Sequence, residues 1–273
     1  MAKPKKIIIH LLSFFFPTKK MRKNVRKKIN TYFDGVRKYA STNKRLRVCG
    51  KNNTLVIIEK NGTKKILKKS PKGLKISVYG DNNTIIIKHP IDFKNSEIII
   101  GDWFLNSNNG AYVELNSSRM IHNLKIICRS GEKQECILGK NTTVVGAEIF
   151  CDSTAKVHIG CDCMLSRNIT IWGDDGHSIL DKETHQIINK QKQPLTIGNN
   201  VWVGFGVSIM KNAKISDNSI LGAFSVVGGQ YLETNVIIAG IPAQIVKRNI
   251  IWDRRNSFHY LLQNKDNINE TNH

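Results

Sequence analysis

The sequence predicts an all-β fold, a solenoid in which short parallel strands wind into stacked triangular coils. Near copies of one unit, VCGKNNTLVI at residues 48–57 and VYGDNNTIII at residues 78–87, lie thirty residues apart. In the C-terminal half, apolar residues recur with a six-residue period, which breaks once between residues 159 and 227. Asn/Gly turns followed by β-branched runs, repeated along a chain, are typical of β-solenoids.

The six-residue period is sharpest between residues 197 and 227. Apolar residues occupy every sixth position, at Ile197, Val203, Ile209, Ile215, Leu221 and Val227. Small or β-branched residues lie four positions after the first five of these, at Val201, Val207, Ala213, Ser219 and Ser225. This period fits neither a helix nor one long strand, but it fits a short strand with a tight corner. We expect three such units per coil, with the apolar side chains stacked in one interior column.

The chain divides into four segments. Residues 1–44 are basic and amphipathic, residues 45–136 predict irregular solenoid coils, residues 137–248 carry the regular repeats with an inserted loop at 173–195, and residues 249–273 form a tail that begins as a short helix. The first segment holds an apolar run at residues 7–16, about half of the roughly 20 residues that a membrane-spanning helix needs. The basic, helix-like pattern that follows has two interpretations. Residues 1–40 either attach to an anionic membrane surface or pack against protein, their own domain or a partner chain.

The composition limits the partners and the compartment. Lys and Arg number 42 against 21 Asp and Glu, a formal net charge of +21. This charge favours an acidic partner such as nucleic acid, an anionic membrane, an acidic glycan or a phosphorylated cofactor. Since no nucleic-acid recognition motif occurs, we expect no nucleic-acid partner.

The cysteines indicate a reducing compartment. The six cysteines form no CxxC pair, and no cleavable secretory signal is visible. We therefore expect a cytoplasmic protein, peripheral on the inner face of the cytoplasmic membrane if residues 1–40 bind there, with the cysteines buried as small apolar residues. Cys161 and Cys163 have no matching second pair, so no metal is expected.

A polar insertion interrupts the repeat. The six-residue frame also holds at Ile159, Leu165 and Ile171, but Ile197 follows Ile171 by 26 residues, four periods plus two. The insertion begins with GDDGHSIL at residues 173–180. Because the flat face of a solenoid cannot enclose a substrate, a loop of this kind can bring reactive side chains over a groove.

Four stretches on this repeat, GDDGHSI, IGNNVWVG, ILGAFSVV and AGIPAQIVK, resemble the hexapeptide-repeat acyltransferases. The resemblance is to the branch that O-acetylates sugars and capsular or lipopolysaccharide glycans; it covers residues 138–248 well and 48–137 loosely. It implies a left-handed parallel β-helix and a homotrimer, with acetyl-coenzyme A as cosubstrate in the groove between neighbouring subunits. It also implies roles for a loop histidine and a tryptophan about two dozen residues later, here His177 and Trp202.

His177 is the candidate general base. Acetyl transfer to a hydroxyl needs removal of the alcohol proton, and an imidazole suits this work, contributing roughly 10²–10⁴-fold. Asp174 or Asp175 could hold one ring nitrogen, and we favour Asp175. A loop histidine can instead cap or bind backbone, and His185 in the same insertion is the main rival. Trp202 should project outward and contact an oxyanion, a sugar ring or the pantetheine arm, unless it packs between loop and coil.

The remaining candidates for binding acetyl-coenzyme A are small turn residues and two basic residues. Small residues in turns of neighbouring coils let a ligand approach backbone N–H groups, and basic residues after the AGIPA exit are placed to meet phosphates. These candidates are Gly204, Gly222, Ala223, Gly240, Pro242, Lys247 and Arg248.

Together these features predict an O-acetyltransferase that moves acetyl from acetyl-coenzyme A to a sugar hydroxyl of a bacterial surface polysaccharide or its precursor, so that the acceptor is a glycan or a nucleotide sugar. An N-acetyltransferase for an amino sugar is the nearest alternative. A non-catalytic β-solenoid for binding or assembly would need neither the DDGH loop nor the AGIPA exit. A metal-dependent hydratase of the carbonic anhydrase kind would need three converging histidines, and only His158, His177 and His185 are near.

Overall fold

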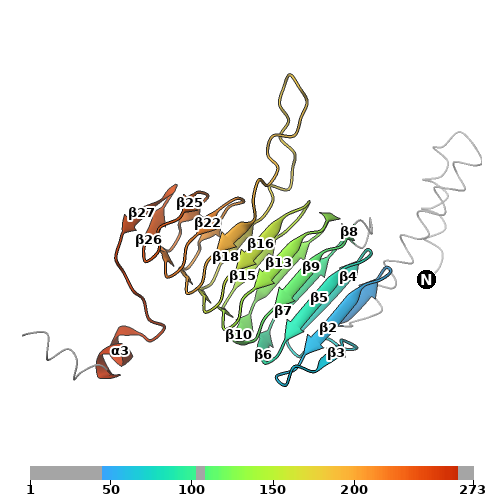
Figure 1. Cartoon of the computed structure of the whole chain (residues 1–273), viewed down its shortest axis with the longest axis horizontal. Helices are drawn as coiled ribbons and strands as arrows, with labels where there is room; N and C mark the ends of the chain where they lie inside the picture. The colour runs from blue at the N-terminus through green and yellow to red at the C-terminus, as the bar shows by residue number, and fades with distance from the viewer. Residues whose placement is uncertain (1–44, 103–107, 264–273) are drawn as a thin grey trace, which may run out of the picture. The chain divides into compact units, whose positions relative to one another are not determined.

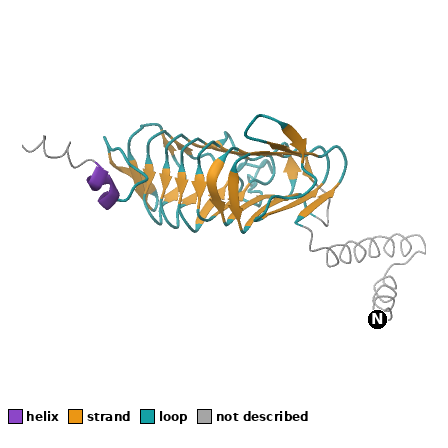
Figure 2. Ribbon diagram, turned by 90° about the horizontal axis from the view of Figure 1, so that it is seen from below, coloured by secondary structure: helices purple, strands orange, loops and turns teal. Residues whose placement is uncertain are grey.

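Three long sheets of short strands form the scaffold (Figure 1). The computed structural model describes residues 45–102 and 108–263, and the structural statements below concern those residues. The chain passes from sheet 1 to sheet 2 to sheet 3 and back, so each circuit adds one coil. In Figure 2 the strands lie in rows, and the corner loops follow the edges of the rows.

The strand bounds are given sheet by sheet, in chain order. Sheet 1 contains β1 (Leu46–Cys49), β4 (Leu74–Tyr79), β7 (Ser96–Ile100), β11 (Leu124–Cys128), β15 (Ala147–Phe150), β18 (Ile169–Trp172), β21 (Ser208–Ile209) and β24 (Val226–Val227). Sheet 2 contains β2 (Thr54–Ile58), β3 (Lys64–Ile66), β5 (Thr84–Lys88), β9 (Tyr112–Leu115), β13 (Glu135–Leu138), β16 (Lys156–Ile159), β19 (Leu195–Ile197), β22 (Lys214–Ile215) and β25 (Gln230–Tyr231). Sheet 3 contains β6 (Ile91–Lys94), β10 (Ser118–His122), β14 (Thr143–Val144), β17 (Met164–Leu165), β20 (Trp202–Val203), β23 (Ile220–Leu221), β26 (Ile237–Gly240) and β27 (Ala243–Lys247).

Three smaller elements complete the described chain. The short strands β8 (Asn108–Asn109) and β12 (Gly131–Glu132) pair with each other at the corner between sheets 1 and 2, and a helix, α3 (Ser257–Gln263), lies in the C-terminal tail. Pairing among the named strands is parallel in the coils and antiparallel at two ends, between β2 and β3 and between β26 and β27. The predicted all-β parallel solenoid is therefore confirmed, and the expected boundary at residues 136/137 falls within β13, so both sets of coils belong to one stack.

The six-residue period of the sequence is the length of one side of the coil. Strand partners lie three periods apart, which is one full circuit; the pairs are Ile197 and Ile215, Val203 and Leu221, and Ile209 and Val227. The expected single interior column is wrong, because these residues form three columns, one for each sheet. Ile159 still pairs with Ile197, so the insertion leaves the frame of the coils intact.

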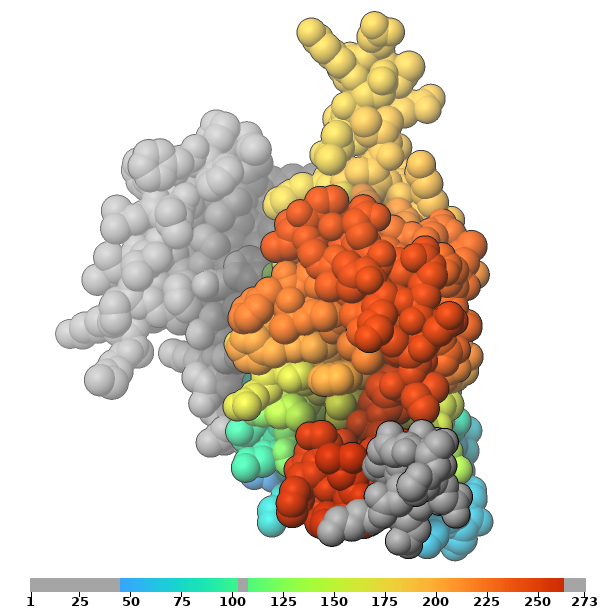
Figure 3. Space-filling model, turned by 90° about the vertical axis from the view of Figure 1, so that its left-hand side faces the viewer, coloured from blue at the N-terminus to red at the C-terminus, as the bar shows by residue number. Residues whose placement is uncertain are grey.

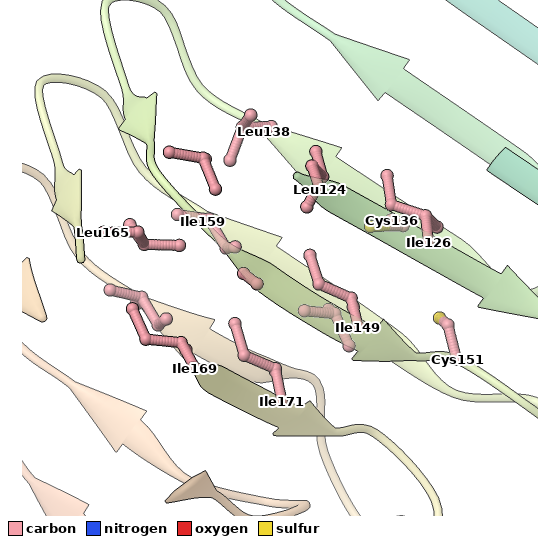
Figure 4. Close-up of a cluster of buried hydrophobic side chains, with 14 of the residues drawn as sticks. Leu124, Ile126, Cys136, Leu138, Ile149, Cys151, Ile159, Leu165, Ile169 and Ile171 are labelled. Atoms are coloured by element: carbon pink, nitrogen blue, oxygen red, sulfur yellow. The ribbon is translucent and has the colours of Figure 1, made fainter. Parts of the chain in front are cut away.

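The core is the interior of the coil stack. Figure 4 shows aliphatic side chains of successive coils stacked inward, among them Ile149 and Ile171, which lie at paired positions of β15 and β18. Four of the six cysteines are buried in this core, as predicted, whereas Cys161 is half-buried and Cys49 is exposed. Burial raises the pKa of the Cys163 thiol to about 11, so this side chain behaves as a small apolar residue.

Two expectations about the ends of the chain have different outcomes. The predicted basic helical segment at residues 1–44 lies outside the described residues. The tail does contain a short helix, α3, which begins after Asn256. None of the described helices is long and apolar enough to cross a membrane.

Candidate active site

The insertion is a projecting loop at the corner between sheets 1 and 2. It leaves β18 at Gly173 and returns to the scaffold at β19, and it stands clear of the coils (Figures 1 and 3). Its outer half is a hairpin closed by a bridge between Leu180 and Ile187. The hairpin exposes four large aliphatic side chains: Ile179, Leu180, Ile187 and Ile188. An apolar surface on a projecting hairpin is typical of a segment that packs against another chain.

His177 lies in the inner half of this loop and is exposed. Its backbone carbonyl accepts a hydrogen bond from Asn189 Nδ2 at 2.8 Å. The same amide donates to Asp175 Oδ2 at 2.8 Å, and Asn189 Oδ1 accepts from the Ile179 N–H at 2.8 Å. One asparagine therefore fixes the backbone on both sides of His177 and leaves the imidazole ring facing solvent.

The carboxylates of the DDGH sequence anchor the loop. Asp174 Oδ1 accepts from the Gly176 N–H at 2.7 Å. Asp175 forms an ion pair with Lys211, one coil further along, and Lys211 also donates to the Asn189 carbonyl. Burial alone would raise the pKa of Asp175, but hydrogen bonds from Lys211 and Asn189 hold it below its ordinary value. Among the described residues, both carboxylates therefore have partners other than the His177 ring, and the predicted bond between Asp175 and that ring is not seen.

Lys211 and Asn189 are site residues that sequence reasoning missed. They meet Asp175 across 36 and 14 residues of chain, respectively. Lys211 occupies a corner position whose side chain faces outward, where the repeat places no constraint on residue type. No short motif therefore identifies this contact.

His185, the alternative candidate for the base, lies in the turn of the hairpin. Its N–H donates to the Asp181 carbonyl at 3.0 Å, and its φ of 53° places it in the left-handed region of the hairpin turn. Asp181 also accepts from the Thr184 N–H at 2.7 Å, so this carboxylate organises the turn. His185 is therefore part of a turn at the outer end of the loop, beyond the hairpin bridge.

Trp202 projects outward from β20 in sheet 3, as predicted, and is 37% exposed. Its neighbours in the sheet are Met164 on β17 and Ile220 on β23. In a three-sided coil, sheet 3 is the side opposite the corner between sheets 1 and 2. His177 and Trp202 of one chain therefore lie on opposite sides of the scaffold and do not form one site.

Gly204, Gly222 and Ala223 come together at the corner between sheets 3 and 1. The Gly204 N–H donates to the Leu221 carbonyl at 2.9 Å, and the Gly222 N–H donates to the Ile238 carbonyl at 2.8 Å. A Cβ on Gly204 would lie 2.6 Å from the Leu221 carbonyl oxygen, so the coil stacking itself requires this glycine. The Ala223 N–H has no backbone acceptor among the described residues, and this residue is exposed.

An exposed aromatic pair lies at the same corner and was missed from sequence. The rings of Phe205 and Phe224 meet edge to face with centroids 5.2 Å apart. Phe224 is 63% exposed and has a φ of 59°, a left-handed conformation that is unfavourable for a bulky side chain. The equivalent corner positions in the two preceding coils are Asn168 and Gly206, with φ values of 57° and 69°. A strained aromatic residue where asparagine or glycine would serve suggests a binding role.

The C-terminal candidates lie at the end of sheet 3. The Gly240 N–H donates to Ser225 Oγ at 3.1 Å, and Pro242 directly precedes β27. Lys247 is exposed on β27. Arg248 forms a two-point ion pair with Glu233, at 2.7 and 3.0 Å, which raises the pKa of Arg248. The predicted contacts of these residues with coenzyme A phosphates stay predictions.

The histidines named for the hydratase alternative do not gather in the described chain. His158 lies on β16 with its Nε2 3.2 Å from Glu135 Oε1, while His177 and His185 belong to the loop. Among the described residues, no group of three or more histidine, cysteine or acidic side chains is arranged to hold a metal ion.

Comparison with known proteins agrees with this architecture. A family model described as bacterial transferase hexapeptide (six repeats) matches residues 194–229. A polysialic acid O-acetyltransferase of Neisseria meningitidis is 31% identical over 195 residues, covering 71% of this chain and 86% of the relative. A polysialic acid O-acetyltransferase of Escherichia coli O1:K1 / APEC is 34% identical over 155 residues, covering 56% of this chain; the match spans 48% of that relative, about half its length.

A solved structure supports the same conclusion. The crystal structure of the polySia-specific acetyltransferase NeuO matches with a TM-score of 0.59 and 27% identity, covering 83% of this chain and 96% of NeuO. Three findings agree: the coil of three parallel sheets, the match to the repeat family model, and a relative that is 31% identical and matched over 86% of its length. This chain therefore belongs to the hexapeptide-repeat acetyltransferase family.

Proposed function

We propose that the protein is an O-acetyltransferase that transfers acetyl from acetyl-coenzyme A to a hydroxyl of an acidic bacterial surface polysaccharide, with polysialic acid as the first acceptor to test. The observation that carries the proposal is the loop that holds His177 exposed above the coils. The relatives named above act on polysialic acid, and a net charge of +21 favours a polyanionic acceptor.

The proposal requires a second copy of the chain. His177 and Trp202 lie on opposite sides of one coil stack, so a site that uses both must combine the loop of one subunit with sheet 3 of another. The exposed aliphatic hairpin gives the loop an apolar surface for such a contact. We infer a homotrimer with three equivalent sites, built on coils that wind with the left-handed sense of the family.

Each group has a defined part in the reaction. The His177 imidazole takes the proton of the acceptor hydroxyl as its oxygen attacks the thioester carbonyl, and the proton passes to the departing thiolate of coenzyme A. Trp202 Nε1 and the Ala223 N–H are donors available to the developing oxyanion. The Gly204 N–H does not serve, because it already donates to Leu221.

The corner between sheets 3 and 1, beside Ala223, suits the acetyl donor, acetyl-coenzyme A. We call it the donor corner. The exposed rings of Phe205 and Phe224 offer an apolar surface to the pantetheine arm, and Lys247 offers a cation to a phosphate. Arg248 can do so only by leaving Glu233.

The direct test is incubation of the protein with labelled acetyl-coenzyme A and polysialic acid, with neutral polysaccharides, nucleotide sugars and amino sugars as comparison acceptors. We expect labelled acetyl to be incorporated into the acidic polymer. Mild alkali should release this label, because it hydrolyses an ester. Label that resists mild alkali would indicate an amide and an N-acetyltransferase. No incorporation into any acceptor would contradict the proposal.

We also propose that residues 1–40 hold the protein at the inner face of the cytoplasmic membrane. The support is the basic sequence around the apolar run at residues 7–16. Deleting residues 1–40 should release the protein from vesicles that contain anionic lipid without abolishing turnover of a soluble acceptor. Full-length protein that never sediments with these vesicles at low salt would contradict this proposal.

A further inference from the structure

The C-terminal tail folds back over the coils along the corner between sheets 2 and 3. We call residues 248–255 the C-terminal strap; it follows β27 and leads to α3 (Figure 1). Ile250 and Asn235 are joined by two hydrogen bonds of 3.0 Å, from the Ile250 N–H to the Asn235 carbonyl and from Asn235 Nδ2 to the Ile250 carbonyl. From that coil the strap runs toward earlier coils.

The strap donates hydrogen bonds to backbone carbonyls of several coils at this corner. Each coil turns here through a residue in the left-handed region, including Asp162, Asn200 and Asn235, whose φ values are 58°, 52° and 60°. Trp252 Nε1 donates to the Asn200 carbonyl at 2.8 Å. Arg254 donates to the Asp162 carbonyl at 2.7 Å and reaches further acceptors on neighbouring residues: the Cys163 carbonyl at 2.7 Å and Thr143 Oγ1 at 2.9 Å. These bonds hold the strap in one position across several coils.

The strap places one indole beside another. The rings of Trp252 and Trp202 have centroids 6.1 Å apart and planes tilted by 43°, while the Arg254 guanidinium lies 5.9 Å from the centre of the Trp252 ring. Trp202 follows Asn200 by two residues, so the carbonyl that fixes Trp252 belongs to the same turn. Trp252 is half-buried, whereas Trp202 keeps an open face.

We propose that Trp252 is a positioning residue, which the strap fixes against the Trp202 indole so that this side chain stays in one orientation at the acceptor site. The inference rests on the proposed function for the role of Trp202, but the contact itself does not. Trp202 lies on a two-residue strand between Met164 and Ile220, and its 37% exposure leaves the indole room to change rotamer. An aromatic partner that is itself hydrogen-bonded to the scaffold restricts that change.

Kinetics of three strap variants and one control variant test the role of the strap. Trp252→Ala should lower kcat by about tenfold through misplacement of Trp202, with little change in the KM for acetyl-coenzyme A; Trp252→Phe, which keeps a ring, should recover most of this loss. Arg254→Met should reproduce the loss, because Arg254 contacts the Trp252 ring and ties the strap to the coils. Ile251→Ala is the matched control, because this strap residue is 85% exposed, and it should behave as wild type. Wild-type kcat in Trp252→Ala, or no recovery in Trp252→Phe, would overturn the proposal.

A second readout does not need the reaction. Full-length protein labelled with 5-fluorotryptophan gives ¹⁹F resonances for the 4 tryptophans, and Trp202→Phe identifies that of Trp202. Trp252→Ala should shift and broaden the Trp202 resonance, and Ile251→Ala should not. An unchanged Trp202 resonance would overturn the positioning role whatever the kinetics show. If wild-type protein transfers acetyl to no acceptor, the proposed function fails, and the ¹⁹F result alone decides this inference.

Discussion

The regular coils and the inserted loop are held together in different ways. Between Leu195 and Tyr231 every sixth side chain is buried inside the coil, and each coil repeats the backbone pairing of the one before. The loop at residues 173–194 buries little apolar surface and depends on a few polar contacts around Asn189, Asp175 and Lys211. The stability of the scaffold is therefore spread over many buried apolar side chains, whereas the position of His177 depends on a few polar contacts.

The largest effect should come from the loop itself. His177→Ala removes the base and leaves the donor corner unchanged, so turnover should fall by about 10²-fold or more, while the KM for acetyl-coenzyme A changes little. His185→Ala is the matched control from the same loop and should be nearly silent, because His185 belongs to the hairpin turn. Steady-state kinetics of both variants measure this difference. A dead His185→Ala with an active His177→Ala would mean that the roles are reversed.

The next largest effect should be a loss of stability, which we expect from a substitution in the coils and not from one in the loop. Ile209 is fully buried in the column of sheet 1, so Ile209→Ala should lower the free energy of unfolding by about 2–5 kcal/mol. Lys182→Ala, at an exposed polar position of the hairpin, should leave coil stability within about 0.5 kcal/mol of wild type. Urea denaturation followed by circular dichroism measures both changes. Equal losses in the two variants would contradict the division between scaffold and loop.

Loosening the loop should have an intermediate effect. Lys211→Met removes the cation that holds Asp175 and Asn189 but keeps the aliphatic stem of the side chain. Turnover should fall by about tenfold because His177 is less well placed, with the unfolding transition unchanged; Lys214→Met is the control, from an exposed lysine on β22. Wild-type turnover in Lys211→Met would show that the anchor does not position His177.

The same anchor has a predictable pH dependence. The pKa of Asp175 is lowered in the folded protein, so the stabilisation it provides is complete above the ordinary carboxyl pKa of about 4. That stabilisation is lost only as the pH falls through the lower value of the folded state. Lys211→Met should therefore have the same relative effect on turnover at every pH between 6 and 8. A relative effect that varies across this range would indicate another titrating partner.

The smallest effect should come from the donor corner. Phe224→Gly relieves a left-handed conformation that costs a bulky residue about 1–2 kcal/mol, but it also removes the contact with Phe205, so stability should change by about 1 kcal/mol or less. The KM for acetyl-coenzyme A should rise a few-fold, and Phe224→Asn should behave alike, since Asn168 fills the equivalent corner. An unchanged KM in both variants would mean that the aromatic pair serves another ligand or a subunit contact.

The sequence predicts the scaffold better than the site. The six-residue period follows from the coil geometry, so the strands, the insertion and the outward direction of Trp202 could all be predicted. The contacts of Lys211 with Asp175 and of Trp252 with Asn200 join positions 36 and 52 residues apart that obey no period. The expected pairing of Asp175 with the His177 ring is not observed for a related reason. Closeness in sequence favours that pairing, but Asp175 forms its ion pair with Lys211 instead.

One measurement tests the claim that each active site combines two chains. His177→Ala and Trp202→Ala should each be nearly inactive alone, because every site of either homotrimer lacks one group. Chains of the two variants assembled together in equal amounts should recover about one quarter of wild-type turnover, since a quarter of the sites then join an intact loop to an intact sheet 3. Mixed assemblies that stay as inactive as either parent, with mixing confirmed by mass spectrometry, would contradict the shared site.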